Sequence, residues 1–261
     1  MRNLNLIYNK LYYSKLSEID FAKLSSPKDY EKKAAVESFS KDITHCNDLL
    51  TKAVFNHSDD YNEMPKDIMS HSFLMETVYP GALIGMGNPH GSHLSLADSN
   101  MGFSFDYVTG QPYIPGSSVK GVLRSLFKDH PEVVAEILKH ITKKAVDVKK
   151  LEYEIFDGED VFFDAVIYKG NQIGHIIGFD YLAPHPQKTK SPIPIQFIKV
   201  LPDVSFEFRF KFSTKDCVIS QEEKVKLFQK LLELFGIGAK TNTGYGKLRS
   251  VLYKETNYEK Q

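Results

Sequence analysis

The chain has 261 residues, 42% of them hydrophobic and 25% charged, a composition that excludes fibrous and disordered proteins. Its 33 basic and 33 acidic residues balance, so net charge by itself indicates no nucleic acid or membrane surface. Two cysteines, no CxxC pair and no long apolar run argue against a disulfide scaffold, a zinc site and a membrane span. We therefore expect a reduced, cytoplasmic protein with no cofactor, no metal and no membrane partner.

The N-terminal third of the sequence predicts a helix, a strand and a long loop. Residues 29–55 predict an amphipathic helix, because apolar residues recur at near-helical spacing: Ala35, Phe39, Ile43, Leu50 and Val54. After a polar connector, residues 73–84 predict a strand that Pro80 and Gly81 interrupt. The segment GMGNPHGSHLSLADSNMG (85–102) has little apolar content and the length of a functional or disordered loop.

The middle of the chain predicts a turn followed by two helices. Turn residues fill 106–112, and the segment PGSSVKGVLRSLF (115–127) offers N-cap hydroxyls in front of a helix. One face of that helix is apolar: Val119, Val122, Leu123, Leu126 and Phe127. A second helix is predicted over 131–145.

The C-terminal half predicts three strands, a capped helix and a last strand. The three strands are expected at 160–168, 172–182 and 204–212. In the third, phenylalanines alternate with Glu207, Arg209 and Lys211, so we expect the phenylalanines in the core and the charged residues in water. Ser220 is expected to cap a helix over 220–235, and KLRSVLY (247–253) returns as a strand.

This order of elements predicts a mixed α+β fold rather than alternating β–α units. A ferredoxin-like split βαβ architecture with long loop insertions fits it best. We divide the chain into an N-terminal helical extension over 1–68, packed on the core, and a single ferredoxin-like domain over 69–261.

Motifs of the common enzyme classes are missing from the sequence. The phosphate-binding patterns GxxxxGK[ST] and GxGxxG do not occur, nor do HExxH, GxSxG or the kinase signatures. His90 and His93 share one loop, but no carboxylate or cysteine stands at a spacing that completes a metal site.

Two segments carry residues suited to binding phosphate groups, and the first is a helix start. Gly116, Ser117 and Ser118 occupy a helix N-terminus, where free N–H groups and the helix dipole attract anions. Lys120 and Arg124 share one face of the same helix. The alternative is an ordinary cap beside two solvated cations.

The second segment is GIGAKTNTGYGKL (236–248), directly after the last helix. Its glycines let the backbone approach a polyanion, its lysines supply charge, and Tyr245 offers a ring for stacking. The alternative is a helix C-cap with the tyrosine packed inward. We expect both segments to converge in one cationic cradle, to which this one contributes Gly238, Lys240, Thr241, Asn242, Gly244, Tyr245 and Lys247.

Both segments resemble motifs of the RAMP superfamily of CRISPR RNA-binding proteins. YVTGQPYIPGSSVKGVLRSLF is similar to the family's TGxPYIPGSSxKGxxR segment, and LFGIGAKTNTGYGKL to its C-terminal glycine-rich loop. IFDGEDVFFDAVI (155–167) is similar to a strand in which many members carry FxDA. IIGFDYLAPHPQ, SPIPIQFIKV and GMGNPHG are most similar to one subunit of the type III-B (Cmr) effector complex, and the resemblance covers residues 72–253.

The resemblance implies an RRM-related, ferredoxin-like RAMP fold and a non-catalytic, RNA-binding role in antiviral defence. Such a subunit contacts guide RNA and target RNA near the 3′ end of the guide, caps the backbone filament and binds other Cmr subunits. The RNA-binding candidates are then the two segments above together with Asn88, His90 and His185.

Three other interpretations stay open. Related backbone subunits cleave target RNA with an aspartate in the loop after the first strand. In this chain Asp98 is the one acid of that loop, but counting back without gaps from the TGxPY segment places Asn100 at the position of the catalytic aspartate. Metal-free cleavage by His90 and His93 is a second route. A scaffold that holds protein neighbours is the third, because 18 Phe and 14 Tyr exceed the need of a small sheet.

Overall fold

The computed structural model describes residues 3–11, 14, 29–61, 63–65, 67–85, 103–182, 194–215 and 217–251. Its helices are α1 (Leu4–Asn9), α3 (Asp29–Thr51), α4 (His57–Asp60), α5 (Gly116–Asp129), α6 (Pro131–Thr142), α7 (Val148–Phe156) and α8 (Gln221–Phe235). Its strands are β1 (His71–Thr77), β2 (Tyr113–Ile114), β3 (Val161–Phe162), β4 (Ala165–Lys169), β5 (Ile177–Leu182), β6 (Ile195–Val200), β7 (Ser205–Lys211) and β8 (Leu248–Val251).

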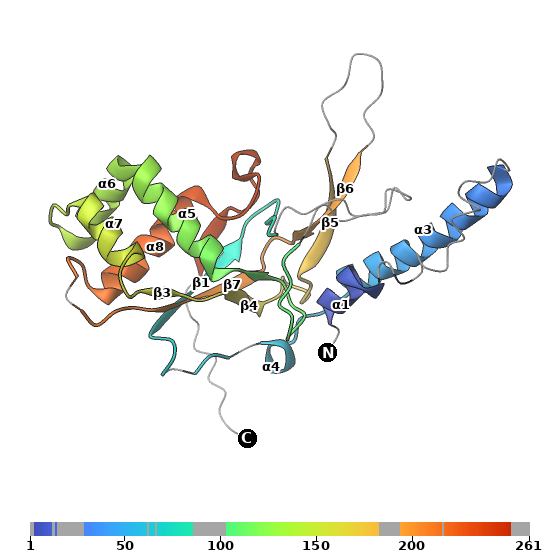
Figure 1. The fold of residues 1–261 in the computed structure, drawn as a ribbon, viewed down its shortest axis with the longest axis horizontal. Coiled ribbons are helices and arrows are strands. Elements are labelled where there is room, and N and C mark those ends of the chain that lie inside the picture. Colours follow the sequence, from blue (N-terminus) through green and yellow to red (C-terminus); the bar gives the residue numbers. More distant parts are fainter. Residues whose placement is uncertain are drawn as a thin grey trace, which may run out of the picture.

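The main sheet is antiparallel and has the order β2–β4–β7–β1–β8, with β3 pairing with β7. Since α5 lies between β1 and β4 in the chain and α8 between β7 and β8, the core elements follow the ferredoxin-like βαββαβ order. The predicted α+β fold is confirmed. Figure 1 shows α5, α6, α7 and α8 gathered on one side of the sheet and α4 on the other, while β5 and β6 form a separate hairpin.

The hydrophobic core lies between the main sheet and the helices above it. Phe206, Phe208 and Phe210 of β7 are fully buried, and Phe228 and Leu231 of α8 pack in the same cluster. Helix α8 begins as predicted, with Ser220 accepting from the Glu223 N–H in a capping box. The apolar alternation of β7 and the apolar stripe of α8 thus build one core.

The charged face of β7 is buried, which contradicts the expectation that it faces water. Glu207 and Arg209 are 2% and 1% exposed, and only Lys211 is exposed. The segment around α4 covers this face: the Tyr61 hydroxyl donates to Glu207 Oε2 at 2.6 Å. Alternation identifies two faces of a strand, but it does not reveal which distant segment covers the second.

Several predicted elements have different ends in the structure. Helix α3 ends at Thr51, so Val54 is 60% exposed although Phe39, Ile43 and Leu50 are buried as predicted. The strand expected at 160–168 is two strands, β3 and β4, separated at residues 163–164. Five elements lie in segments where the sequence predicted no helix or strand: α1, α4, α7, β2 and β6.

The N-terminal helices share the core of the sheet. Leu4, Ile7 and Phe39 belong to the same buried apolar cluster as Phe206 and Leu248. The division into an N-terminal extension over 1–68 and a domain over 69–261 stays a prediction. None of the helices in the described ranges is both long and apolar enough to cross a membrane.

Candidate nucleic-acid interface

The start of α5 is held by a carboxylate from the chain itself. The Gly116 N–H donates to Asp164 Oδ1 at 2.7 Å. A Cβ at Gly116 would lie 2.2 Å from the carbonyl oxygen of Phe162, so only glycine permits this close approach. The Gly116 N–H is therefore not free for a phosphate group, which corrects the expected anion site. Ser117 and Ser118 are exposed and do not cap the helix.

Arg124 belongs to the contact between α5 and α7. Its Nε lies 3.1 Å from Glu152 Oε1, and its Nη2 lies 2.6 Å from Asp157 Oδ2. Hydrogen bonds from the guanidinium to Asp157 and then to Glu152 raise the pKa of Arg124. We therefore remove Arg124 from the RNA-binding set. Lys120, whose Nζ lies 5.8 Å from the centroid of the Phe162 ring, stays in it.

The glycine-rich loop (236–246) packs against the segment that follows β1. The Gly246 N–H donates to the carbonyl oxygen of Gly81 at 2.8 Å. Gly238 has a φ of 95°, and a Cβ there would lie 2.4 Å from the carbonyl oxygen of Leu83. These glycines are needed for packing of the loop on its own chain, which is the alternative that the sequence left open.

The tip of this loop presents polar groups at the surface. Lys240 has a left-handed backbone conformation with a φ of 58°, and a short 3₁₀ turn, η3 (Thr241–Thr243), follows it. Asn242 is exposed, and Thr241 and Gly244 are half-buried. A Cβ at Gly244 would meet only Pro80, at 3.5 Å, so this glycine borders open space. Side-chain donors and an open backbone occur together here.

Tyr245 and Lys247 point back into the fold. The Tyr245 hydroxyl donates to Asp180 Oδ2 at 2.7 Å, and its ring meets Phe197 nearly edge-on with centroids 6.0 Å apart. Burial and then Asp180 raise the pKa of Tyr245 to about 12. Lys247 Nζ donates to the carbonyl oxygen of Leu234 at 3.2 Å, where a cation offsets the dipole of α8. Tyr245 therefore packs inward, as the alternative interpretation of the sequence expected. Lys247 binds a free carbonyl group at the C-terminal end of α8.

The two predicted segments do not form one cradle. Strand β2 leads into α5 and β8 follows the glycine-rich loop, and these strands are the two edges of the sheet. Four strand spacings separate them, or about 19 Å. The expected convergence of Lys120 and Arg124 with the loop is therefore corrected.

The glycine-rich loop instead adjoins two other segments of the fold. It contacts residues 81–83, which lead toward the long loop, and it contacts β5, which leads toward residues 183–193 (Figure 1). The candidates predicted in those two loops lie outside the described residues: Asn88, His90, Asp98 and His185.

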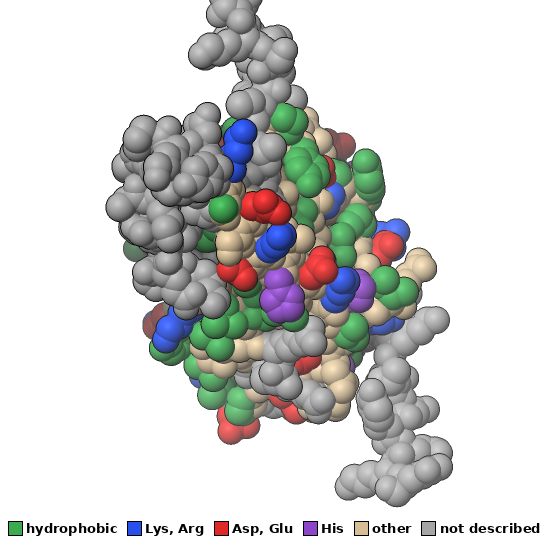
Figure 2. All heavy atoms as spheres, turned by 90° about the vertical axis from the view of Figure 1, so that its right-hand side faces the viewer, with side chains coloured by type: hydrophobic (Ala, Val, Ile, Leu, Met, Phe, Trp, Pro, Cys, Tyr) green, Lys and Arg blue, Asp and Glu red, His purple; other side chains and the backbone are tan. Residues whose placement is uncertain are grey.

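Basic side chains near the loop are largely paired with acids. Lys199 Nζ lies 2.6 Å from Asp180 Oδ2, and Arg249 Nη2 lies 2.9 Å from Asp203 Oδ1. On the face in Figure 2, most of the Lys and Arg side chains that are described lie near Asp or Glu, and they form no continuous patch. Lys240, at the loop tip, is half-buried and has no acidic partner among the described residues.

Comparisons with known proteins identify the family. The model of the RAMP superfamily matches residues 74–249, which include both motifs and more than half of the chain. The chain belongs to the RAMP superfamily. Its resemblance to the superfamily, noted in the sequence, is thereby confirmed.

Two curated relatives of this RAMP protein are subunits of CRISPR systems. The CMR subunit Cmr6 of Saccharolobus solfataricus is 30% identical over 175 residues, which cover 63% of this chain and 52% of that protein. The chain thus spans about half the length of this relative. The Cmr6 subunit of Pyrococcus furiosus is 23% identical over 330 aligned positions, 94% of each protein.

A solved structure has a similar fold. It is a chain in the cryo-EM structure of the type III-B Cmr-beta bound to cognate target RNA. The two chains are 18% identical and superpose with a TM-score of 0.63 over 95% of this chain and 96% of that one.

Proposed function

We propose that this RAMP protein is a non-catalytic, RNA-binding subunit of a type III-B CRISPR (Cmr) effector complex in antiviral defence. It contacts guide RNA and target RNA near the 3′ end of the guide, caps the backbone filament and binds other Cmr subunits in the cytoplasm. The two Cmr6 relatives and membership in the superfamily support the assignment to such a complex. The exposed tip of the glycine-rich loop is the observation that carries RNA binding.

The chemistry of the loop tip suits contact with an RNA backbone. Lys240 supplies a cation, Thr241 and Asn242 supply hydrogen-bonding groups, and Gly244 leaves the backbone accessible. Guides differ in sequence but share their backbone, so a subunit that serves every guide gains from contacts with phosphate and sugar. Few cations converge here, so we expect modest affinity from the single subunit and stronger retention inside the assembled particle.

Loss of positive charge at the loop tip tests this function. In Lys240→Ala, the affinity for single-stranded RNA should fall, and the slope of log affinity against log salt should flatten by about 0.7 for the lost phosphate contact. Lys226→Ala is the matched control, because Lys226 is exposed on α8 more than two turns from the loop. If the dependence of RNA affinity on salt concentration is the same in Lys240→Ala as in wild type, the loop tip does not contact RNA.

The nuclease alternative has a separate test. Target RNA is incubated with Mg²⁺ and a reconstituted particle that contains either the wild-type subunit or Asp98→Ala. If the subunit is non-catalytic, the particle with Asp98→Ala should give the same RNA cleavage products as the wild-type particle. The loss of one cleavage product in the variant would assign catalysis to this chain.

A further inference from the structure

Tyr79 projects from a segment that is otherwise packed into the fold. Its side chain is 81% exposed, whereas the other residues of 73–84 are buried or half-buried. Single exposed rings are common on protein surfaces, so the meaning of this one depends on its backbone and its neighbours.

Hydrogen bonds fix the backbone on both sides of Tyr79. The Val78 N–H donates to the carbonyl oxygen of Lys247 at 3.0 Å, and the Gly81 N–H donates to the carbonyl oxygen of Val78 at 2.7 Å. The carbonyl oxygen of Gly81 in turn accepts from the Gly246 N–H at 2.8 Å. The turn that carries Tyr79 is therefore tied to the end of the glycine-rich loop. A ring on such a fixed backbone loses little conformational entropy when a ligand covers it.

Two further observations place Tyr79 beside the open tip of the glycine-rich loop. A Cβ at Gly244 would lie 3.5 Å from Cδ of Pro80, the residue that follows Tyr79. After burial and Asp180, the charge of an ionised Tyr79 adds to the rise in the pKa of Tyr245. The hydroxyl groups of these two tyrosines therefore lie within electrostatic range of each other.

The cation of the loop tip lies within one turn of this contact. The Gly244 N–H donates to the carbonyl oxygen of Thr241 at 3.1 Å, and the Thr243 N–H donates to that of Lys240 at 2.9 Å. These bonds wind residues 240–244 into a compact turn, so Lys240 and Gly244 lie close together. An RNA strand that binds Lys240 therefore has Tyr79 within reach of a neighbouring nucleotide.

The character of this surface favours a nucleobase over a protein as the partner of the ring. The loop residues Asn242 and Thr243 are exposed and polar, so the ring does not belong to the apolar centre that protein interfaces have. The nearby carboxylate of Asp180 is offset by Lys199, whose Nζ lies 2.6 Å away, so it opposes a phosphate group only weakly. Surfaces that bind single strands combine cations for the backbone with aromatic rings on which bases stack.

We propose that Tyr79 is the platform on which an unpaired base of the RNA stacks. The inference rests on the proposed function, because the same strand binds the loop tip through its backbone. Stacking uses the π face that every base has, so it adds affinity without a strong preference for sequence, as a subunit that serves every guide requires. The stacking role expected of Tyr245 is thereby assigned to Tyr79.

The first experiment measures the affinity of the isolated chain for two probes, a single-stranded RNA and an abasic strand of equal length and charge. Wild type should bind the RNA about tenfold more tightly, since one stacked base contributes roughly that factor. Tyr79→Ala should lose most of this preference, whereas Tyr79→Phe should keep it because it keeps the ring. Tyr153→Ala is the matched control, because Tyr153 is 70% exposed but belongs to α7.

A second experiment detects the stacked base directly. The chain has no tryptophan, so Tyr79→Trp places a single indole fluorophore at this position. Its emission should change when the RNA binds and stay constant with the abasic strand, because only the RNA brings a base onto the ring. In the control Tyr153→Trp, neither strand should change the emission.

Three outcomes would overturn the base site. These are equal binding of both strands by wild type, an undiminished preference in Tyr79→Ala, and an emission of Tyr79→Trp that the RNA leaves constant. If Tyr79→Ala reduces only the retention of this chain in a particle reconstituted with the other Cmr subunits, the ring contacts protein and the inference is wrong.

The salt dependence separates this inference from the proposed function. Tyr79 binds no phosphate group, so Tyr79→Ala should keep the salt slope of wild type, whereas Lys240→Ala should flatten it. A flattened slope in Lys240→Ala with an undiminished preference in Tyr79→Ala would overturn the base site alone. A wild type that binds neither strand would remove both proposals.

Discussion

Replacing Arg209 by methionine should destabilise the fold by about 3–5 kcal/mol, because it leaves the carboxylate of Glu207 buried without its cation. The two side chains are 1% and 3% exposed and their charged atoms lie 2.7 Å apart, so water cannot take the place of the lost partner. The Tyr61 and Ser72 hydroxyls still donate to Glu207, which limits the loss. The expected change is about a third of the stability of a typical native domain.

Urea denaturation followed by circular dichroism measures this change. Lys211→Met is the matched control, because Lys211 follows on the same face of β7 and is exposed, so its effect should stay within about 0.5 kcal/mol. The double variant Glu207→Leu with Arg209→Met should be more stable than Arg209→Met alone, since it removes the orphaned charge. A wild-type midpoint for Arg209→Met would refute the reasoning, as would a double variant less stable than the single one.

The same pair should give a signature at acid pH. Burial would raise the pKa of Glu207, but the hydrogen bond from Tyr61 and the charge and hydrogen bond of Arg209 lower it below its ordinary value. A carboxyl group whose pKa is lower in the folded state contributes stability above its unfolded pKa of about 4.3 and loses it as pH falls. The stability of Arg209→Met should therefore fall less steeply than that of wild type below about pH 4.3.

Further predictions concern the residue that caps α5, two glycines with different surroundings, and Tyr245. Asp164→Ala should lower the unfolding free energy by about 1 kcal/mol in a thermal melt, because it removes the acceptor of the first N–H of α5; an unchanged melt would contradict this. Gly246→Ala should prevent wild-type folding, since its Cβ would lie 1.9 Å from a carbonyl oxygen, whereas Gly121→Ala, with open space around it, should raise stability by about 0.5–1 kcal/mol. In an ultraviolet titration, the tyrosine that ionises at about pH 12 should be missing from Tyr245→Phe. Because that pKa is raised by folding, the stability it provides is present below about pH 10 and is lost toward pH 12 in wild type only.

The sequence was sufficient to locate the candidate RNA-binding loop along the chain. It was only partly sufficient to predict which residues that loop contacts in the fold. The glycine-rich loop and its lysines were recognisable because glycine has a conformational freedom that no other residue shares. Which groups the loop leaves free was not recognisable. Tyr245 looks like a stacking platform, but in the structure its hydroxyl donates a hydrogen bond to Asp180, 65 residues away. Arg124 looks like a phosphate ligand until Asp157, 33 residues away, binds its guanidinium.

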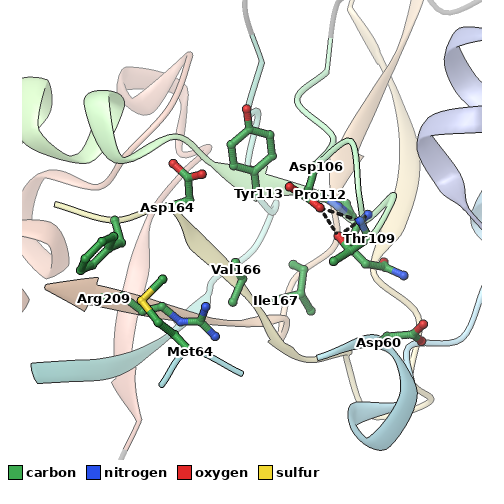
Figure 3. Close-up of a pocket in the computed structure, with 12 residues that line it drawn as sticks. Asp60, Met64, Asp106, Thr109, Pro112, Tyr113, Asp164, Val166, Ile167 and Arg209 are labelled. Carbon is green, nitrogen blue, oxygen red and sulfur yellow. Dashed lines mark hydrogen bonds between the residues drawn. The ribbon is translucent and has the colours of Figure 1, made fainter. Parts of the chain in front are cut away.

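A small pocket between α4, the turn before β2 and strand β4 could not have been predicted from local patterns. Its wall joins residues that lie far apart in the sequence, such as Asp60, Asp106 and Asp164 (Figure 3). The aspartate of the FFDA segment was part of the family resemblance, yet its role as the cap of α5 appeared only when β3 and Gly116 were placed side by side.

The sequence by itself determined the α+β class, most helices and strands, and the superfamily. The fold class and the elements depend on apolar periodicity, capping and turn residues, which act over a few positions of the chain. The superfamily depends on the resemblance of two motifs to those of the family. The tertiary structure alone decided that Glu207 and Arg209 are buried, and that the helix start and the glycine-rich loop lie at opposite edges of the sheet. The reason is physical: a polar side chain takes its role from the partner that desolvates or bonds it, and for Glu207 that partner, Tyr61, is 146 residues away.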